Sequence, residues 1–177
     1  MKKNKILILE GGYNEEHEIS LATAKEIKKS LYNLNIEFKS LIVSPNNFEE
    51  KINKFNNQYM CINALHGPYG EDGQIQKILE GLSFKFTHSD SEASKIGFNK
   101  ELSKKALSDS KLRLLDHVIL ETKSIDKDKL IEIFLKLGAF ILKPVASGSS
   151  FGIKIFKNIN EINLFSKDLK KNLYLYK

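Results

Sequence analysis

Three short segments of this chain combine glycines with charged or hydroxyl side chains, and each has residues that could bind or transform a ligand. They are Glu10–Ser20, Ala64–Gly73 and Leu142–Gly152. Glycine permits tight turns and lets a ligand approach the backbone closely. Each segment is therefore a candidate binding loop.

The first segment has two adjacent glycines, Gly11 and Gly12, followed by the carboxylates of Glu15, Glu16 and Glu18. These acids lie just before or at the start of a predicted helix. A carboxylate in that place can hold an ammonium group. Acids also favour a helix N-terminus through its dipole, so the residues alone leave both interpretations open.

The second segment places His66, Glu71 and Asp72 in one loop with three glycines. Asp72 alone could cap the helix that follows. A cap does not require a histidine and a second acid, and loops carried by a rigid sheet often hold functional residues. The pattern therefore favours a functional loop.

The third segment is rich in glycine and serine and follows Lys143. Backbone N–H groups and hydroxyls in a hairpin turn can wrap phosphates, and a lysine adds a positive charge. The order of a Walker loop is missing, and a flexible hairpin is the other interpretation. Lys100 stands at the start of another predicted helix, where a lysine is more often solvent-exposed than part of a functional site.

The elements expected around the first two loops alternate between strands and helices, which is typical of the α/β class. That order predicts right-handed crossovers and a parallel sheet, whose ligands bind at the carboxyl ends of the strands. Both loops fall at such ends. The predicted strands are 5–9, 38–43, 59–65 and 83–87, and the predicted helices are 20–34, 48–55 and 74–82.

The pattern changes near Ser89–Asp90, which predicts two domains, 1–89 and 90–177. Asp126 is expected to cap an amphipathic helix that Gly138 ends. The last residues, 172–177, are either a strand or a frayed helix end. The other elements expected here are helices at 91–97, 100–108, 126–137 and 158–169, a strand-like run at 112–120, and a hairpin of 140–143 with 153–156.

Composition excludes several classes of protein. The chain has 177 residues, one cysteine and a formal net charge of +6. Nearly all the positive charge is lysine, and Arg113 is the only arginine, so we weigh against a nucleic-acid partner. No run approaches the ~20 apolar residues of a membrane span, so we expect no membrane partner. The four histidines are scattered and there is no second cysteine, so the sequence predicts no metal ligands. A single cysteine, which can form no internal disulfide, fits a cytoplasmic location.

Together the three segments resemble D-alanine–D-alanine ligases of the ATP-grasp type. The family's opening motif, Gly-Gly-x-Ser-x-Glu-x-x-Val/Ile-Ser, is followed closely by 11–20. His-Gly-x-x-Gly-Glu-Asp-Gly is matched by 66–73, and Lys-Pro-x-x-x-Gly-Ser-Ser-x-Gly by 143–152. The likeness covers essentially the whole chain. It implies a Rossmann-like, pre-ATP-grasp N-terminal domain, then an incomplete α+β central ATP-grasp subdomain, with the C-terminal catalytic domain absent.

The resemblance implies a reaction in peptidoglycan synthesis. ATP phosphorylates the carboxylate of a first D-alanine, and the amine of a second D-alanine attacks the acylphosphate. The family needs ATP and two Mg²⁺ ions, whose ligands are expected in the missing C-terminal part, and it commonly forms homodimers. The chain as given is expected to be inactive alone.

The resemblance also implies roles for individual residues. In the amino-acid site, Glu16 should hold the ammonium of the first D-alanine, His66 should orient its carboxylate, and Glu71 should support the same site. Ser149 should join a hydrogen-bond network with Glu16. Residues expected to contact ATP phosphates or close over them are Lys100, Lys143, Ser150, Phe151 and Gly152.

The sequence departs from the family at one loop position, because Asn14 stands where serine is usual. A larger side chain there implies a somewhat different loop geometry. Tyr174 and Tyr176 stand where the family's adenine-contacting strand has an acid, if 172–177 is that strand. Two alternatives remain open, a non-catalytic D-alanine- or nucleotide-binding module and a D-alanine–D-lactate-type ligase.

Overall fold

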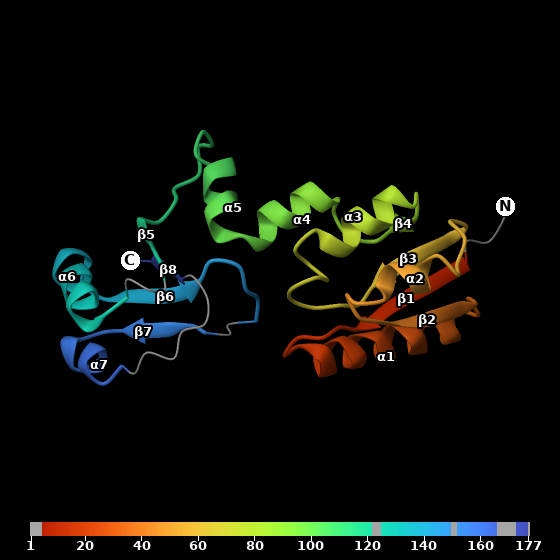
Figure 1. Ribbon diagram of the computed structural model, residues 1–177, viewed down its shortest axis with the longest axis horizontal. Coiled ribbons are helices and arrows are strands. Elements are labelled where there is room, and N and C mark those ends of the chain that lie inside the picture. Colours follow the sequence, from red (N-terminus) through yellow and green to blue (C-terminus); the bar gives the residue numbers. More distant parts are fainter. Residues whose placement is uncertain (1–4, 122–124, 150–151, 166–172, 177) are drawn as a thin grey trace. The chain divides into compact units, whose positions relative to one another are not determined.

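The computed structural model describes residues 5–121, 125–149, 152–165 and 173–176. The chain divides into two compact units, Met1–Phe98 and Asn99–Lys177 (Figure 1). Within the first unit, α4 (Ser91–Phe98) packs on α3 (Gln74–Gly81). The division between compact units therefore follows α4, whereas the sequence placed a domain boundary before it.

The first unit is built on a four-stranded sheet in the order β2-β1-β3-β4, and every pair in it is parallel. The predicted α/β class and parallel sheet are therefore confirmed for this unit. The strands are β1 (Lys5–Gly11), β2 (Phe38–Val43), β3 (Tyr59–Asn63) and β4 (Lys85–Phe86).

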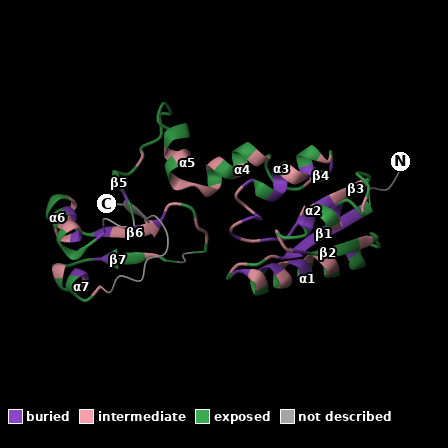
Figure 2. Cartoon of the chain, in the orientation of Figure 1, coloured by how far each residue is buried: buried purple, intermediate pink, exposed green. Residues whose placement is uncertain are grey.

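The central strand β1 is buried on both faces, as an apolar run in a parallel sheet requires. Its alternate residues belong to separate cores. Ile6 and Ile8 pack with Ala24 of α1 (His17–Asn33), whereas Leu7 and Leu9 pack with α2 (Phe48–Ile52) and α3. Figure 2 shows the burial concentrated along β1 and β3, between the helices. The sheet thus holds the ends of β1 and β3 at fixed places.

The second unit has an antiparallel sheet in the order β5-β8-β6-β7. Its core gathers Leu142, Phe140 and Phe156 from the sheet with Leu130 and Ile162 from the helices. The strands are β5 (His117–Leu120), β6 (Phe140–Pro144), β7 (Lys154–Phe156) and β8 (Leu173–Tyr176), and the helices are α5 (Lys100–Ala106), α6 (Lys127–Leu137) and α7 (Ile159–Asn163).

Several local predictions for this unit are confirmed. The Asp126 side chain accepts a hydrogen bond from the Lys129 N–H and caps α6, and Gly138 ends the helix with φ 77°. β6 and β7 pair as the expected antiparallel hairpin. The final segment forms a strand, β8, rather than a frayed helix end.

Two predicted lengths are wrong. Of the strand expected over 112–120 only β5 forms, and within the described residues its ladder with β8 pairs no residue before His117. The helix expected over 158–169 stops at Asn163, and of its remainder the residues from 166 lie outside the described ranges. None of the helices within the described ranges is long and apolar enough to cross a membrane.

Candidate functional site

The first candidate loop connects β1 to α1 through a glycine turn. Gly11 and Gly12 have φ angles of 91° and 90°, which side chains rarely adopt. The Gly11 N–H donates to Ser20 Oγ at 2.8 Å, and the Gly12 N–H donates to the Val43 carbonyl at 3.2 Å. The turn is therefore anchored both to α1 and to the neighbouring strand.

Glu16 stands at the N-cap position of α1 and is 3% exposed. Its carboxylate lies against the second loop. A Cβ atom added at Gly67, which has φ 71°, would lie 2.5 Å from Glu16 Oε2. Glycine at this position thus lets the backbone of the second loop approach the carboxylate.

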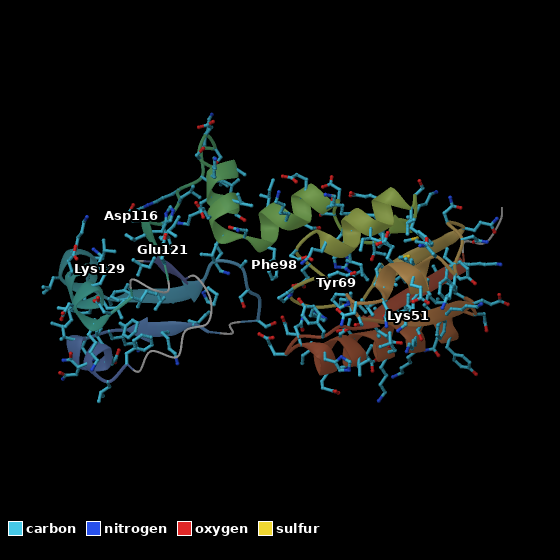
Figure 3. The ribbon with its side chains drawn as sticks, viewed as in Figure 1. Lys51, Tyr69, Phe98, Asp116, Glu121 and Lys129 are labelled. Atoms are coloured by element: carbon cyan, nitrogen blue, oxygen red, sulfur yellow. The ribbon has the colours of Figure 1, made fainter. Side chains whose placement is uncertain are left out.

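The acidic side chains of the second loop, His66–Gly73, accept hydrogen bonds from the backbone of the loop. Tyr69 of this loop is labelled in Figure 3. Asp72 accepts hydrogen bonds from the Tyr69 N–H at 2.9 Å and from the Gln74 N–H at 3.1 Å. Glu71 Oε2 accepts from the Gly67 N–H at 2.9 Å. Asp72 therefore does serve the start of α3, and Glu71 shapes the part of the loop that faces Glu16.

His66 is half-buried and contacts both loops. Its Nε2 is 2.9 Å from Thr23 Oγ1 on α1, and its Nδ1 is 3.8 Å from Glu71 Oε1. The second contact is an ion pair only when the imidazole is protonated. The structure therefore gathers Glu16, His66 and Glu71, which lie far apart in the sequence, at the carboxyl ends of β1 and β3.

Asn14 joins the two loops directly. Its Nδ2 donates to the His66 carbonyl at 2.9 Å and to the Pro68 carbonyl at 3.0 Å, and its Oδ1 accepts from the Glu16 N–H at 2.8 Å. The sequence singled out Asn14 only as a departure from a motif. Its bonding to residues 52 and 54 positions away had no local signal.

Two buried amides support the second loop from below, and sequence reasoning missed both. Asn63 Nδ2 and Gln76 Nε2 donate to the Gly70 carbonyl at 2.8 and 2.7 Å. Asn63 Oδ1 also accepts from the Leu65 N–H at 3.1 Å. The sequence signal was a polar residue at a position where the pattern predicts burial. Asn63 ends a buried strand, and Gln76 falls on the inward face of α3.

An ion pair between a buried carboxylate and a partly exposed lysine lies beneath the first loop. Glu10 is 3% exposed, and Lys28 Nζ of α1 lies 2.6 and 2.7 Å from its two carboxylate oxygens. Glu10 continues the face of β1 that carries Ile6 and Ile8, so an acid there interrupts an apolar alternation. That interruption was the signal for a paired charge.

The second unit brings Lys100 and Lys143 near one another. Lys100 Nζ donates to the Ser147 carbonyl at 2.9 Å, and its N–H donates to the Val145 carbonyl at 3.0 Å. Burial, and then the positive charge of Lys143, lower the pKa of Lys100 from its ordinary 10.5. Lys100 is half-buried against the third loop, and its contact with ATP phosphates stays a prediction.

Two of the described residues of the third loop lie in the left-handed region. Ser149 has φ 47° and Gly152 has φ 73°, and a Cβ atom at Gly152 would lie 2.9 Å from Pro144 Cγ. Ser150 and Phe151, which the sequence assigned to phosphate binding, lie outside the described residues. The network expected between Ser149 and Glu16 remains a prediction.

Two further features of the described residues are the absence of a cluster of metal ligands and an open hollow away from the motif loops. In the described part of the chain, no three His, Cys, Asp or Glu side chains gather closely enough to hold a metal ion. An open hollow of about 710 Å³ lies at the amino ends of β1, β2 and β3, lined by residues such as Lys5, Tyr32 and Tyr59. Ligands of parallel sheets bind at the opposite ends of the strands, where the motif loops are.

Comparison with known proteins shows that the chain is similar to D-alanine–D-alanine ligases. It is 39% identical to D-alanine–D-alanine ligase of Wolbachia pipientis wMel, over 85% of this chain and 46% of that protein. It is 38% identical to the D-alanine–D-alanine ligase of Pelagibacter ubique, over 89% of this chain and 56% of that protein. The chain thus spans about half the length of the curated relatives that it matches. No family model matches it.

Solved structures give the same relation. The crystal structure of a D-alanine–D-alanine ligase from Bacillus anthracis complexed with ATP matches with a TM-score of 0.73 and 25% identity. The match covers 98% of this chain and 58% of that chain. The likeness therefore extends across both compact units.

Proposed function

Because the chain is related in sequence and fold to D-alanine–D-alanine ligases, we propose that it is part of an ATP-dependent enzyme that joins two D-alanines. Its first unit corresponds to the N-terminal domain of such a ligase, and its second unit to the central ATP-grasp subdomain. The complete reaction uses residues beyond those of this chain, because the chain spans about half of its relatives.

One observation carries the proposal, namely the buried Glu16 carboxylate where two motif loops meet. Glu16 is 3% exposed and lies beside Gly67, with His66 in the same loop. A carboxylate accepts charge-assisted hydrogen bonds, and the ammonium group of an amino acid can add one to the contacts that Glu16 already makes. Glu16 is therefore assigned the ammonium of the first D-alanine.

The carboxylate of the same amino acid is assigned to His66. Thr23 Oγ1 and Glu71 limit the rotation of the imidazole, since one contacts Nε2 and the other approaches Nδ1. A ring N–H of an imidazole held in this way can donate a hydrogen bond to a carboxylate. Glu71 thus acts through His66 and through the Gly67 N–H that it holds.

ATP phosphates are assigned to the second unit. Lys100 and Lys143 are near enough for the charge of one to lower the pKa of the other, so an anion between them relieves repulsion. Gly152 permits the close loop approach that phosphates need, and Ser150 and Phe151 belong to the same motif. A related ligase in complex with ATP supports this assignment.

The proposed reaction has two steps. A carboxylate oxygen of the first D-alanine attacks the γ-phosphorus of ATP, and ADP leaves. The amine of the second D-alanine then attacks the acyl carbon and loses a proton as phosphate leaves. Glu16 and Ser149 hold the amino acids, and Lys100 and Lys143 stabilise charge on the transferred group.

No magnesium ligand is assigned to this chain, because the family resemblance implies that those ligands lie in the C-terminal part of the enzyme. Magnesium held there would neutralise phosphate charge in phosphoryl transfer. The proposal further includes a cytoplasmic location, a role in peptidoglycan synthesis and a homodimer. A D-alanine–D-lactate specificity would depend on the part of the enzyme that holds the second substrate.

The test is calorimetric titration of this chain with D-alanine, with L-alanine as the stereochemical control. We expect Glu16→Gln to weaken D-alanine binding by at least roughly tenfold, because it removes one charge from a charge-assisted contact. Glu18→Gln, an exposed acid in the same helix turn, is the matched control and should bind as the parent chain does. Unchanged binding by Glu16→Gln, or no preference for D-alanine, would overturn the assignment.

A further inference from the structure

The Asn14 side chain uses both of its N–H donors on the second loop. These donors reach the carbonyls of His66 and Pro68, the two residues that flank Gly67. Its oxygen accepts from the Glu16 N–H. One half-buried amide therefore holds the backbone of Glu16 on one side and the backbone around Gly67 on the other.

These bonds act where the two loops come closest. A Cβ atom at Gly67 would lie 2.5 Å from Glu16 Oε2 and 3.1 Å from Asn14 Nδ2. Any outward movement of the His66–Pro68 segment breaks one or both bonds from Asn14. The imidazole of His66 would then move away from the Glu16 carboxylate, because its own backbone carbonyl is one of the two acceptors.

A serine at this position could not make the same set of bonds. A hydroxyl has one hydrogen to donate, and it lies closer to the backbone than an amide nitrogen. Serine could accept from the Glu16 N–H and donate to one carbonyl, leaving the other without this partner. Asparagine in this chain thus adds a second tie between the loops.

We propose that Asn14 is a positioning residue, which holds the His66–Pro68 segment against Glu16 so that imidazole and carboxylate face one amino acid at a set separation. The role in amino-acid binding rests on the proposed function. The hydrogen-bonded connection between the loops does not depend on that function, and it can be measured without any ligand.

The first experiment is amide hydrogen exchange, resolved by residue, on the full chain and on three Asn14 variants. Asn14→Ala removes every side-chain bond. Asn14→Asp has nearly the same shape and keeps the acceptor for the Glu16 N–H, but it has no donor for the two carbonyls. Asn14→Ser keeps one donor. Asn47→Ala is the matched control, since Asn47 is exposed and its side chain makes no cap bond.

We expect the Gly67 and Glu71 amides, which bond within the second loop, to exchange on the order of tenfold faster in Asn14→Ala and Asn14→Asp. Asn14→Ser should fall between these variants and the parent. The Glu16 amide should stay protected in Asn14→Asp and Asn14→Ser but not in Asn14→Ala, and β1 amides should not change. Unaltered exchange in the second loop, or an equal rise throughout β1, would overturn the proposal.

The second experiment measures D-alanine affinity for the same variants. We expect Asn14→Asp and Asn14→Ala to bind on the order of tenfold more weakly, and Asn47→Ala to bind as the parent chain does. Equal affinity in all variants would overturn the positioning role. If the parent chain binds no D-alanine, the proposed function of this site fails, while hydrogen exchange still decides whether Asn14 connects the loops.

Discussion

At the scale of single residues, Gly67 sets how closely the two loops approach. Its φ of 71° and its proximity to Glu16 both oppose a side chain. We expect Gly67→Ala to lower the free energy of unfolding by about 1–3 kcal/mol, because it adds backbone strain and a clash with the carboxylate. Urea denaturation measures this loss, and D-alanine titration should show weaker binding as well.

Gly81→Ala is the control for that substitution. Gly81 ends α3, has no heavy atom within 4 Å of an added Cβ, and is not among the glycines with positive φ. Alanine is favoured over glycine in a helix by up to about 1 kcal/mol, so this variant should be neutral or slightly more stable. Equal losses for both variants would contradict the close approach at Gly67.

The residue types were sufficient to select His66 and Glu71 as candidates, because a helix cap does not require them, whereas Glu16 was selected by the resemblance to a family motif. The sequence was insufficient for Asn14, Asn63 and Gln76. Asparagine and glutamine are ordinary in loops and helices, and their importance here comes from the carbonyls they reach. Asn14 finds its acceptors 52 and 54 positions along the chain, a distance that no local pattern spans.

At the scale of elements, the Glu10–Lys28 pair ties α1 to β1 beneath the first loop. We expect Lys28→Met to lower the free energy of unfolding by roughly 2–3 kcal/mol, because it leaves a buried carboxylate without this partner. Lys28 is about one-third exposed, so solvent moderates the loss. Chemical denaturation at neutral pH measures it.

The double variant Glu10→Leu/Lys28→Leu separates charge from packing. Replacing a buried pair by apolar side chains is often neutral or stabilising, so the double variant should recover much of the stability lost by Lys28→Met. If both variants lose the same amount, the methylene packing of Lys28 rather than its charge holds α1 in place.

Most elements followed from hydrophobic period and helix signals, and the run 112–120 is an exception. β1, α1 and α6 carry clear apolar patterns, and Asp126 caps α6 as predicted. The run 112–120 is mostly apolar, yet only His117–Leu120 form a strand. A strand extends only as far as its neighbour pairs with it, and β8 offers four paired positions.

At the scale of the whole molecule, each compact unit has its own core. The two clusters of the first unit cover both faces of its sheet and draw only on residues before Ser89. We expect residues 1–98 alone to fold cooperatively, because these cores and α4 are complete within that range. Circular dichroism during urea titration should show one sigmoidal transition.

A gradual loss of signal, without a cooperative transition, would contradict this expectation. The matched comparison is Leu7→Ala in the same fragment. Leu7 is fully buried, so the substitution should lower the free energy of unfolding by about 2–5 kcal/mol. A fragment that is truly folded should respond strongly, whereas a collapsed chain should not.

The sequence by itself determined the parallel α/β sheet of the first unit, the hairpin of the second and the three candidate binding loops, because strand and helix periods and glycine turns are local properties. The tertiary structure decided how those loops use their residues. The approach of Gly67 to Glu16, the double tie from Asn14 and the repulsion between Lys100 and Lys143 arise between segments far apart in the chain. Packing of the elements around each sheet brings those segments together, and a local sequence pattern does not predict such long-range contacts.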